Sequence, residues 1–243
     1  MNKPLASSFE QIVNSRRAVR KYEQDTPFDH EAVRKAIELA TLAPNSSNMQ
    51  LWEFHRVISS EAREQVARCC MGQSAARMAR ELVVIVVRPD KWKKHAHINA
   101  GKIREAYKDQ NDAKARRAHG YYEKLIPMLY NNDRFGVRGA VRKLLTFLRG
   151  LSRPTVREVS RSDVRVSIHK SAGLAAMTFM YAMKSRGYDT CPLEGFDSRR
   201  VKTCLGLPGG SEITMIIGCG KGTSDGVYSE RFRVPLDEVM FEH

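Results

Sequence analysis

The feature that most constrains the fold is the uninterrupted apolar run at residues 82–87 (LVVIVV). A short continuous run of aliphatic residues, without polar alternation, is typical of a strand buried in the core. Residues 212–218 (EITMIIG) predict a second core strand, and shorter strands are expected at 53–58 and 191–193. Strands interleaved with helices favour an α+β or α/β layer architecture.

Helical spacing of apolar residues recurs between these strands. Residues 29–43 (DHEAVRKAIELATLA) follow this pattern, with Asp29 as a candidate N-cap and Pro44 directly after the helix. Other helices are predicted at 9–16, 60–70, 163–186 and from about 197. Residues 218–222 (GCGKG) lack the spacing of a dinucleotide-binding or P-loop motif, so we expect a turn after the last core strand.

The cysteines and the N-terminus indicate a reducing compartment. Five cysteines, an odd number, form no regular disulfide framework, and no His or Cys pair has metal-ligand spacing, so no metal site is expected. The N-terminus has no signal-peptide pattern, and the longest apolar stretch, 171–183, is too short to span a bilayer. We therefore expect a cytoplasmic protein.

Most of the positive charge lies in one internal segment. The net charge is +14, and residues 91–161, here called the basic segment, contain 18 Lys and Arg against 6 Asp and Glu. Helices are predicted at about 99–130 and 137–151, joined by a turn at 131–133. Tyrosines among these cations could stack on nucleic-acid bases, but no recognised nucleic-acid motif is present, so this function is not favoured.

An apolar stripe runs along the second of these helices. It is flanked by basic residues, and its members are Val137, Val141, Leu144, Leu145, Leu148 and Leu151. Such a helix can lie on a membrane surface or dock on a partner. We favour instead a lid helix that packs this stripe over the active site or a subunit interface, because most helices of globular proteins show one apolar face.

Two arginine-rich motifs lie near the ends of the chain. SRRAVRKY (15–22) holds Arg16, Arg17 and Arg20, and a helix would place Arg16 and Arg20 on one face. SERFRVP (229–235) holds Arg231 and Arg233, which point the same way if the segment is extended. A guanidinium fork suits phosphate because it offers paired donors. The motifs predict a phosphate site, although a solvated basic helix end would explain the first motif alone.

Two further motifs carry groups suited to a polar ring. PLEGF (192–196) contains Gly195, which lets a backbone N–H approach a flat ligand closely. LAPNSSNMQLW (42–52) contains amides and hydroxyls that can satisfy the polar atoms of a heterocycle. These are Asn45, Ser46, Ser47, Asn48 and Gln50. An ordinary capped loop would explain this motif equally well by itself.

In order and spacing, the four motifs resemble those of the nitroreductase family. The matching patterns are RRxxR, AP-x-S-x-N-x-Q-x-W, P-x-EGF and a terminal RxR, and the resemblance covers residues 9–90 and 163–240. It implies a three-layer α+β fold, with a central mixed or antiparallel sheet flanked by helices. It also implies a single FMN-binding domain over 1–243, with 91–161 as a helical insertion, and a homodimer with FMN at the subunit interface.

The resemblance also implies roles for individual residues. The arginines, with Ala18, would hold the flavin phosphate and ring edge: Arg16, Arg17, Arg20, Arg231 and Arg233. The loop residues would reach the flavin of the other subunit: Asn45, Ser46, Ser47, Asn48 and Gln50. Pro192, Leu193, Glu194 and Gly195 would lie beside the reactive ring edge, the last two as catalytic residues. Gln73 and Arg77 would lie near the pyrimidine side.

The sequence departs from the family pattern at two positions. Ala18 replaces the usual serine and Leu51 the usual proline, and neither change removes a charged contact, so the FMN assignment stands. The implied activity is hydride transfer from NAD(P)H through flavin N5 to an electron-poor acceptor, such as a nitroaromatic or a quinone, in a ping-pong cycle. Enone reduction and dehalogenation on the same fold are the alternatives.

Overall fold

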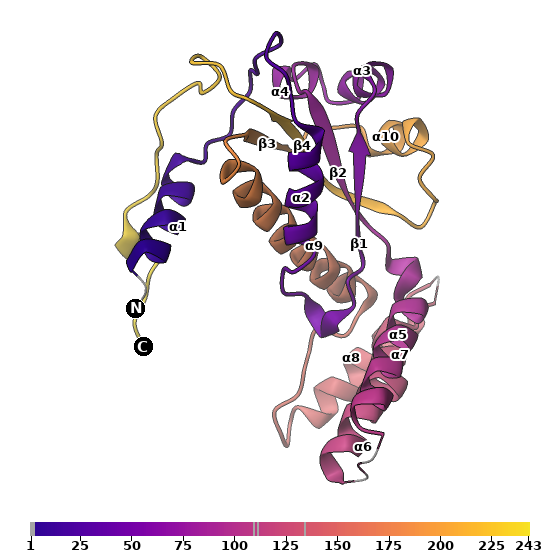
Figure 1. The fold of residues 1–243 in the computed structure, drawn as a ribbon. Coiled ribbons are helices and arrows are strands. Elements are labelled where there is room, and N and C mark those ends of the chain that lie inside the picture. The colour runs from indigo at the N-terminus through magenta and orange to yellow at the C-terminus, as the bar shows by residue number, and fades with distance from the viewer. Residues whose placement is uncertain (1–2, 109, 111, 134) are drawn as a thin grey trace.

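The sheet has four strands, and every neighbouring pair is antiparallel. The computed structural model describes residues 3–108, 110, 112–133 and 135–243. The strands are β1 (Trp52–Val57), β2 (Glu81–Val87), β3 (Asp189–Leu193) and β4 (Glu212–Gly220). Their order is β1-β2-β4-β3, so β3 lies at one edge of the sheet (Figure 1). The predicted α+β class is confirmed, with an antiparallel sheet.

Helices cover both faces of this sheet. The side chains of β2 alternate between two buried clusters, as the period of a strand requires. Val83, Ile85 and Val87 pack in a cluster with α2 (His30–Ala40) and α9 (Arg161–Lys184). Leu82, Val84 and Val86 pack in the second cluster, with α3 (Ser60–Arg68), α4 (Ser74–Arg77) and α10 (Ser198–Cys204). This double burial explains the uninterrupted apolar run, and it confirms the three layers.

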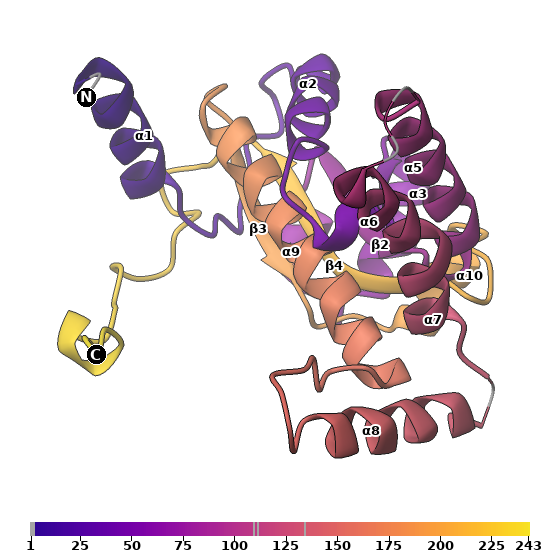
Figure 2. The ribbon, with the colours of Figure 1, turned by 90° about the horizontal axis from the view of Figure 1, so that it is seen from below.

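The remaining helices lie at the periphery of the sheet. They are α1 (Lys3–Ser15), α5 (Trp92–Ala106), α6 (Ala113–Gly120), α7 (Ile126–Tyr130) and α8 (Val137–Arg149), with a π-helical turn at Tyr121–Leu125 and 3-10 turns at Ser46–Asn48, Pro89–Lys91 and Leu236–Glu238. Figure 2 shows α1 and the C-terminal segment projecting from the body, and α8 lying across the opposite end. Among the described residues, no helix has the length and apolar character needed to cross a membrane.

Helix capping explains where the predictions succeed and where one fails. Asp29 caps α2 by accepting a hydrogen bond from the N–H of Glu31 at 2.8 Å. In α9, Ser160 and Asp163 form a reciprocal capping box. The continuous helix predicted over 99–130 is wrong: α5 starts earlier, at Trp92, and ends at Ala106. A new helix, α6, then begins after its N-cap Asp112, and residues 109 and 111 of the predicted helix lie outside the described residues.

The predicted turn over residues 218–222 begins later than expected, because β4 continues through Gly220. Glycine at these strand positions makes room for neighbouring groups. A Cβ at Gly220 would lie 2.7 Å from the ring of the fully buried Tyr22, and one at Gly218 would lie 2.6 Å from the carbonyl oxygen of Ala75. The Tyr22 hydroxyl donates to the Gly218 carbonyl at 3.0 Å. Glycine at these two positions therefore lets the Tyr22 ring and the Ala75 backbone pack closely against β4.

Glu53, at the start of β1, ties the sheet to the beginning of the basic segment. Its carboxylate accepts a hydrogen bond from Arg88 at 3.0 Å and another from Lys91, and it lies 3.0 Å from His55 Nε2. Burial alone would raise the pKa of Glu53. The hydrogen bonds from Lys91, His55 and Arg88 outweigh burial and lower the pKa to about 2.

This depressed pKa predicts a pH-dependent contribution to stability. The contribution is fully present above the pKa of the unfolded carboxyl and is lost as the pH falls toward about 2. We expect Glu53→Gln to lower the free energy of unfolding by about 2 kcal/mol near neutral pH, and by progressively less in acid. Urea unfolding of both proteins between about pH 7 and pH 3 measures this difference. A difference that stayed constant with pH would contradict the assigned role of the charge.

Candidate functional site

The segment after α1 is extended, and it is held between β3 and the C-terminal loop. The N–H of Val19 donates to the carbonyl of Thr190 at 3.2 Å, and the N–H of Arg20 donates to the carbonyl of Gly226 at 2.8 Å. The prediction that Arg16 and Arg20 share a helix face is therefore wrong, since α1 ends at Ser15. Both side chains nevertheless line one cavity.

The N-terminal and C-terminal arginine motifs meet around one cavity. The cavity has a volume of about 300 Å³ and is lined by residues 16–18, 20 and 227–233. Arg231 Nη2 donates to the carbonyl of Arg16 at 2.6 Å, and Arg17 Nη2 donates to the carbonyl of Ser229 at 2.6 Å. We call its five arginines the arginine cradle: Arg16, Arg17, Arg20, Arg231 and Arg233. Glu230 is the single carboxylate among the lining residues.

The arginine cradle concentrates positive charge that its own residues do not neutralise. Burial lowers the pKa of Arg16, and the neighbouring Arg231, Arg233 and Arg17 lower it further. The guanidinium of Arg20 lies 4.9 Å from the ring centre of Tyr228. These mutually repelling cations would be relieved by an anion, and forked guanidinium groups fit the oxygens of a phosphate. Ala18 lies in the same lining, where it adds no charge.

β3 leads from this cradle to the PLEGF motif. Pro192 and Leu193 end the strand, and Glu194 and Gly195 follow it on the surface. The side chain of Gln73 donates to the Gly195 carbonyl at 2.6 Å. The span from Thr190, beside the cradle, to Gly195 is about 16 Å if extended. An elongated ligand can therefore lie along this edge of the sheet, with its anionic end in the cradle.

The structure separates the two residues expected near the pyrimidine side. Gln73 lies against Gly195, where a Cβ on the glycine would approach Gln73 Nε2 to 3.0 Å. Arg77 instead lines a separate cavity of about 530 Å³, together with Gln24 and Arg63. In this chain the two side chains therefore have different neighbours, although both residues belong to the same helical turn.

The loop containing Asn45 to Gln50 has an unusual backbone. Ser47, Asn48 and Gln50 have φ values of 55°, 48° and 48°, in the left-handed region that residues other than glycine seldom occupy. Asn45 Oδ1 accepts the N–H of Gln50 at 2.9 Å, and the N–H of Ser46 donates to Oγ of Ser171 in α9 at 3.1 Å. Strained backbone of this kind persists where the surrounding structure holds it in place, often at functional sites.

The basic segment provides much of the support for this loop. The Tyr122 hydroxyl donates to the carbonyl of Ser47 at 2.9 Å, and the Tyr121 hydroxyl lies 2.7 Å from Oγ of Ser47. Asn99 Nδ2 donates to the carbonyl of Asn48 at 2.8 Å. These contacts were not predicted from the sequence. The tyrosines and the asparagine in the helices of the basic segment could have indicated such contacts, because buried polar side chains need hydrogen-bond partners.

The loop and the arginine cradle lie far apart within one chain. The loop contacts α9 at Ser171, whereas the cradle adjoins Thr190, beyond the end of the same helix. From Ser171 to Lys184 the helix rises about 20 Å. The cavities at the loop and at the cradle share no lining residue. Residues that the sequence assigns to one ligand thus occupy two regions.

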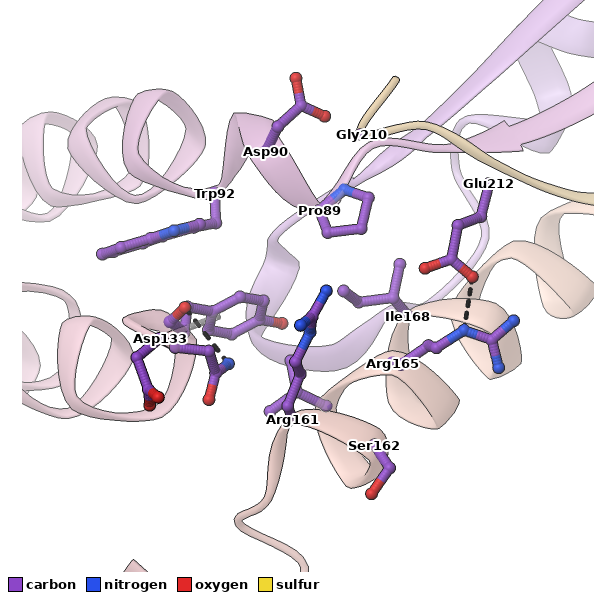
Figure 3. Close-up of a pocket in the computed structure, with 13 residues that line it drawn as sticks. Pro89, Asp90, Trp92, Asp133, Arg161, Ser162, Arg165, Ile168, Gly210 and Glu212 are labelled. Atoms are coloured by element: carbon purple, nitrogen blue, oxygen red, sulfur yellow. Dashed lines mark hydrogen bonds and ion pairs between the residues drawn. The ribbon is translucent and has the colours of Figure 1, made fainter. Parts of the chain in front are cut away.

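A second, larger cavity lies beside the loop, away from the cradle, and it was not predicted from the sequence. Its volume is about 820 Å³. Figure 3 shows residues that line it, and two of its lining residues, Tyr130 and Ile168, also line the small cavity under the loop. Trp92 lines one side of it, and Arg161 extends toward its middle from another element. Arg165 is ion-paired with Glu212 on its rim. We place the candidate site at the cradle and β3, where the charge suited to an anionic ligand converges.

Comparisons with known proteins agree on one family. A family model of the nitroreductase family matches residues 13–221. MhqN of Bacillus subtilis (strain 168), whose name places it among NAD(P)H nitroreductases, is 25% identical over 235 residues, covering 96% of this chain and 98% of its own. A 4-nitrobenzoate reductase of Nocardioides sp. (strain LMS-CY) is 26% identical over 236 residues, covering 91% and 83%.

A solved structure shares the fold over nearly the whole length. The protein from Exiguobacterium sibiricum, solved in complex with FMN, superimposes with a TM-score of 0.67 at 22% identity, covering 97% of each chain. The match of the family model extends from the end of α1 to the end of β4, and it includes Arg16, Arg17 and Arg20 of the cradle and the PLEGF motif. Sequence, layer architecture and family match thus agree, and the chain belongs to the nitroreductase family.

Proposed function

We propose that the chain is an FMN-dependent oxidoreductase that uses NAD(P)H to reduce an electron-poor acceptor. The observation that carries this proposal is the arginine cradle at one end of the edge strand β3. Two comparisons support the assignment. One relative is named as an NAD(P)H nitroreductase, and one solved structure of the same fold contains FMN. The whole chain would form the single FMN-binding domain expected from the sequence.

The residues present fit FMN. Arg16, Arg20 and Arg231 would hold the phosphate, because they concentrate charge in a cavity with one carboxylate. Gln73 and Gly195 would flank the ring at the far end of β3, where the exposed glycine backbone allows close approach. When bound, FMN supplies the two-electron chemistry, taking hydride from a nicotinamide and delivering it to an acceptor in a ping-pong cycle.

We propose a homodimer with two equivalent flavin sites. Within one chain the loop at Asn45 to Gln50 lies about 20 Å along α9 from the cradle, so a second subunit would bring its own loop to the flavin. The C-terminal residues Phe232, Leu236 and Phe241 are largely exposed in a single chain. Their burial against the second subunit would provide apolar contact area. Light scattering of the purified protein tests this proposal, because a homodimer has twice the mass of one chain.

The acceptor would be a nitroaromatic, a quinone or a related electron-poor molecule. A relative that reduces 4-nitrobenzoate supports this class. Enone reduction and dehalogenation are the alternatives on the same fold, because fold alone does not define the acceptor. Steady-state rates with one representative of each class, at equal NADPH, would rank them. An enone or organohalide reduced faster than the nitroaromatic would contradict the proposed class.

The first test is the absorption spectrum of the purified protein. We expect flavin bands between about 350 and 500 nm, and we expect NADPH or NADH to bleach them under anaerobic conditions. A flavin-bound protein that no nicotinamide reduces would retain the cofactor assignment and overturn the electron donor. A colourless protein that does not take up added FMN would overturn the proposal as a whole.

A further inference from the structure

The helix α8 is attached to the protein by its polar side. Within α8, the half-buried and buried positions are Gly139, Arg142 and Thr146, at spacings of three and four residues that place them on one face. The Arg142 side chain donates to the carbonyl of Val159 at 2.9 Å and to that of Met128 at 2.7 Å. Gly139 allows close approach to the segment before α9.

The apolar side of α8 therefore faces outward. Its residues are between 51% and 72% exposed: Val137, Val141, Leu144, Leu145, Phe147, Leu148 and Leu151. The expectation of a lid packed on the body by this stripe does not hold within one chain. Figure 2 shows α8 across the end of the molecule, away from the sheet. An amphipathic helix normally buries this face, so its exposure indicates an external binding partner.

An open groove extends this apolar surface. It lies between α7 and α8, has a volume of about 320 Å³ and includes Pro127, Met128, Val137 and Val141 among its lining residues. Met128 is 53% exposed, although it is apolar. Arg138 and Arg142 also line the groove. A groove with an apolar floor and the exposed guanidinium of Arg138 beside it suits an acyl chain joined to an anionic headgroup.

The charge around α8 identifies the kind of partner. Residues 137–157 contain six Lys and Arg and no Asp or Glu. Within the described part of the chain, no ion pair involves Arg138, Arg149 or Arg153. A second copy placed on this face would bring its own cations against these. An anionic bilayer offers an apolar interior and negative headgroups together, and basic amphipathic helices bind at that boundary.

We propose that α8 and the α7–α8 groove dock the protein on anionic lipid surfaces, with the apolar face of α8 lying in the headgroup region. The binding is peripheral and reversible, because one amphipathic helix contributes a limited apolar area. It does not depend on flavin or on the proposed reaction.

Vesicle sedimentation with the full-length protein tests this proposal. We expect binding to vesicles that contain phosphatidylglycerol, little binding to phosphatidylcholine alone, and weakening by salt. Leu144→Ser/Leu148→Ser should lower partitioning at least ~10-fold. Arg138→Gln/Arg149→Gln should lower it about 30-fold. The matched controls Leu39→Ser/Ile58→Ser and Lys35→Gln/Arg199→Gln change exposed residues elsewhere and should bind like the wild type.

Three outcomes would overturn the proposal. The first is no binding to phosphatidylglycerol vesicles. The second is binding that the leucine variant retains in full. The third is a leucine variant that changes the oligomeric mass in solution, which would assign this face to contact with a second copy. Light scattering of wild type and variant distinguishes the third outcome from the others.

Discussion

Replacing Arg16 and Arg231 together by alanine should weaken FMN binding at least ~100-fold, because each would remove a charge-assisted contact of about 1.5–3 kcal/mol. Both guanidinium groups line the arginine cradle, and burial beside other cations lowers the pKa of Arg16, so an anion is the favoured occupant. Titration of the apoprotein with FMN, followed by the quenching of flavin fluorescence, gives the dissociation constant.

Arg231 also donates to backbone carbonyls near the end of α1, so loss of structure must be separated from loss of charge. The variant Arg16→Lys/Arg231→Lys keeps the charge but lacks the fork, and should bind with intermediate affinity. Arg68→Ala/Arg199→Ala removes two exposed arginines from α3 and α10 and should bind like the wild type. Equal affinity in the double-alanine variant and the wild type would place the phosphate elsewhere.

Arg56→Met should lower the free energy of unfolding by about 3–5 kcal/mol, because it leaves a buried carboxylate without its main partner. Glu81, at the start of β2, is fully buried. Its oxygens accept hydrogen bonds from Arg56 at 2.6 and 3.0 Å, and one lies 2.6 Å from His30 Nδ1. Urea unfolding at one fixed protein concentration measures the change.

The double variant Arg56→Met/Glu81→Leu should recover most of this loss, because well-packed apolar residues can replace a buried ion pair. Lys102→Met is the control, since its pair with Glu105 at 3.2 Å lies on the surface and should contribute less than about 1 kcal/mol. A loss in Arg56→Met no larger than in Lys102→Met would contradict the role of Arg56 as the main partner of the buried Glu81 carboxylate.

The strands and capped helices could be predicted because their signals are local. The run 82–87 alternates between two buried clusters, so no position in it can be polar, and Asp29 marks the start of its helix through a bond two residues away. The break near Asp112 was missed. Charge and aromatic content continue across it, and a single capping residue is a weaker signal than long periodicity.

The arrangement of the site depends on contacts between distant segments. Arg16 to Arg20 contain helix-forming residues, but the backbone there pairs with Thr190 and Gly226, which lie about 170 and 200 residues away. Only the family resemblance predicted that the two arginine motifs act together, and in the structure both line one cavity. The orientation of α8 could not be predicted, because periodicity shows that a helix has two faces and not which of them meets the protein.

The basic segment is continuous in the sequence, but its two parts differ in how they attach to the rest of the protein. Its first part contributes Ala96, Ile126 and Tyr130 to the core, and its tyrosines fasten the strained loop after α2. Its second part, α8, contacts the body mainly through Arg142 and Gly139. A variant that lacks only α8 would keep the conformation of this loop. A variant that lacks the whole basic segment from Trp92 onward would lose the hydrogen bonds that hold the loop. Recombination between relatives should therefore exchange the second part freely, and the first part only together with the loop.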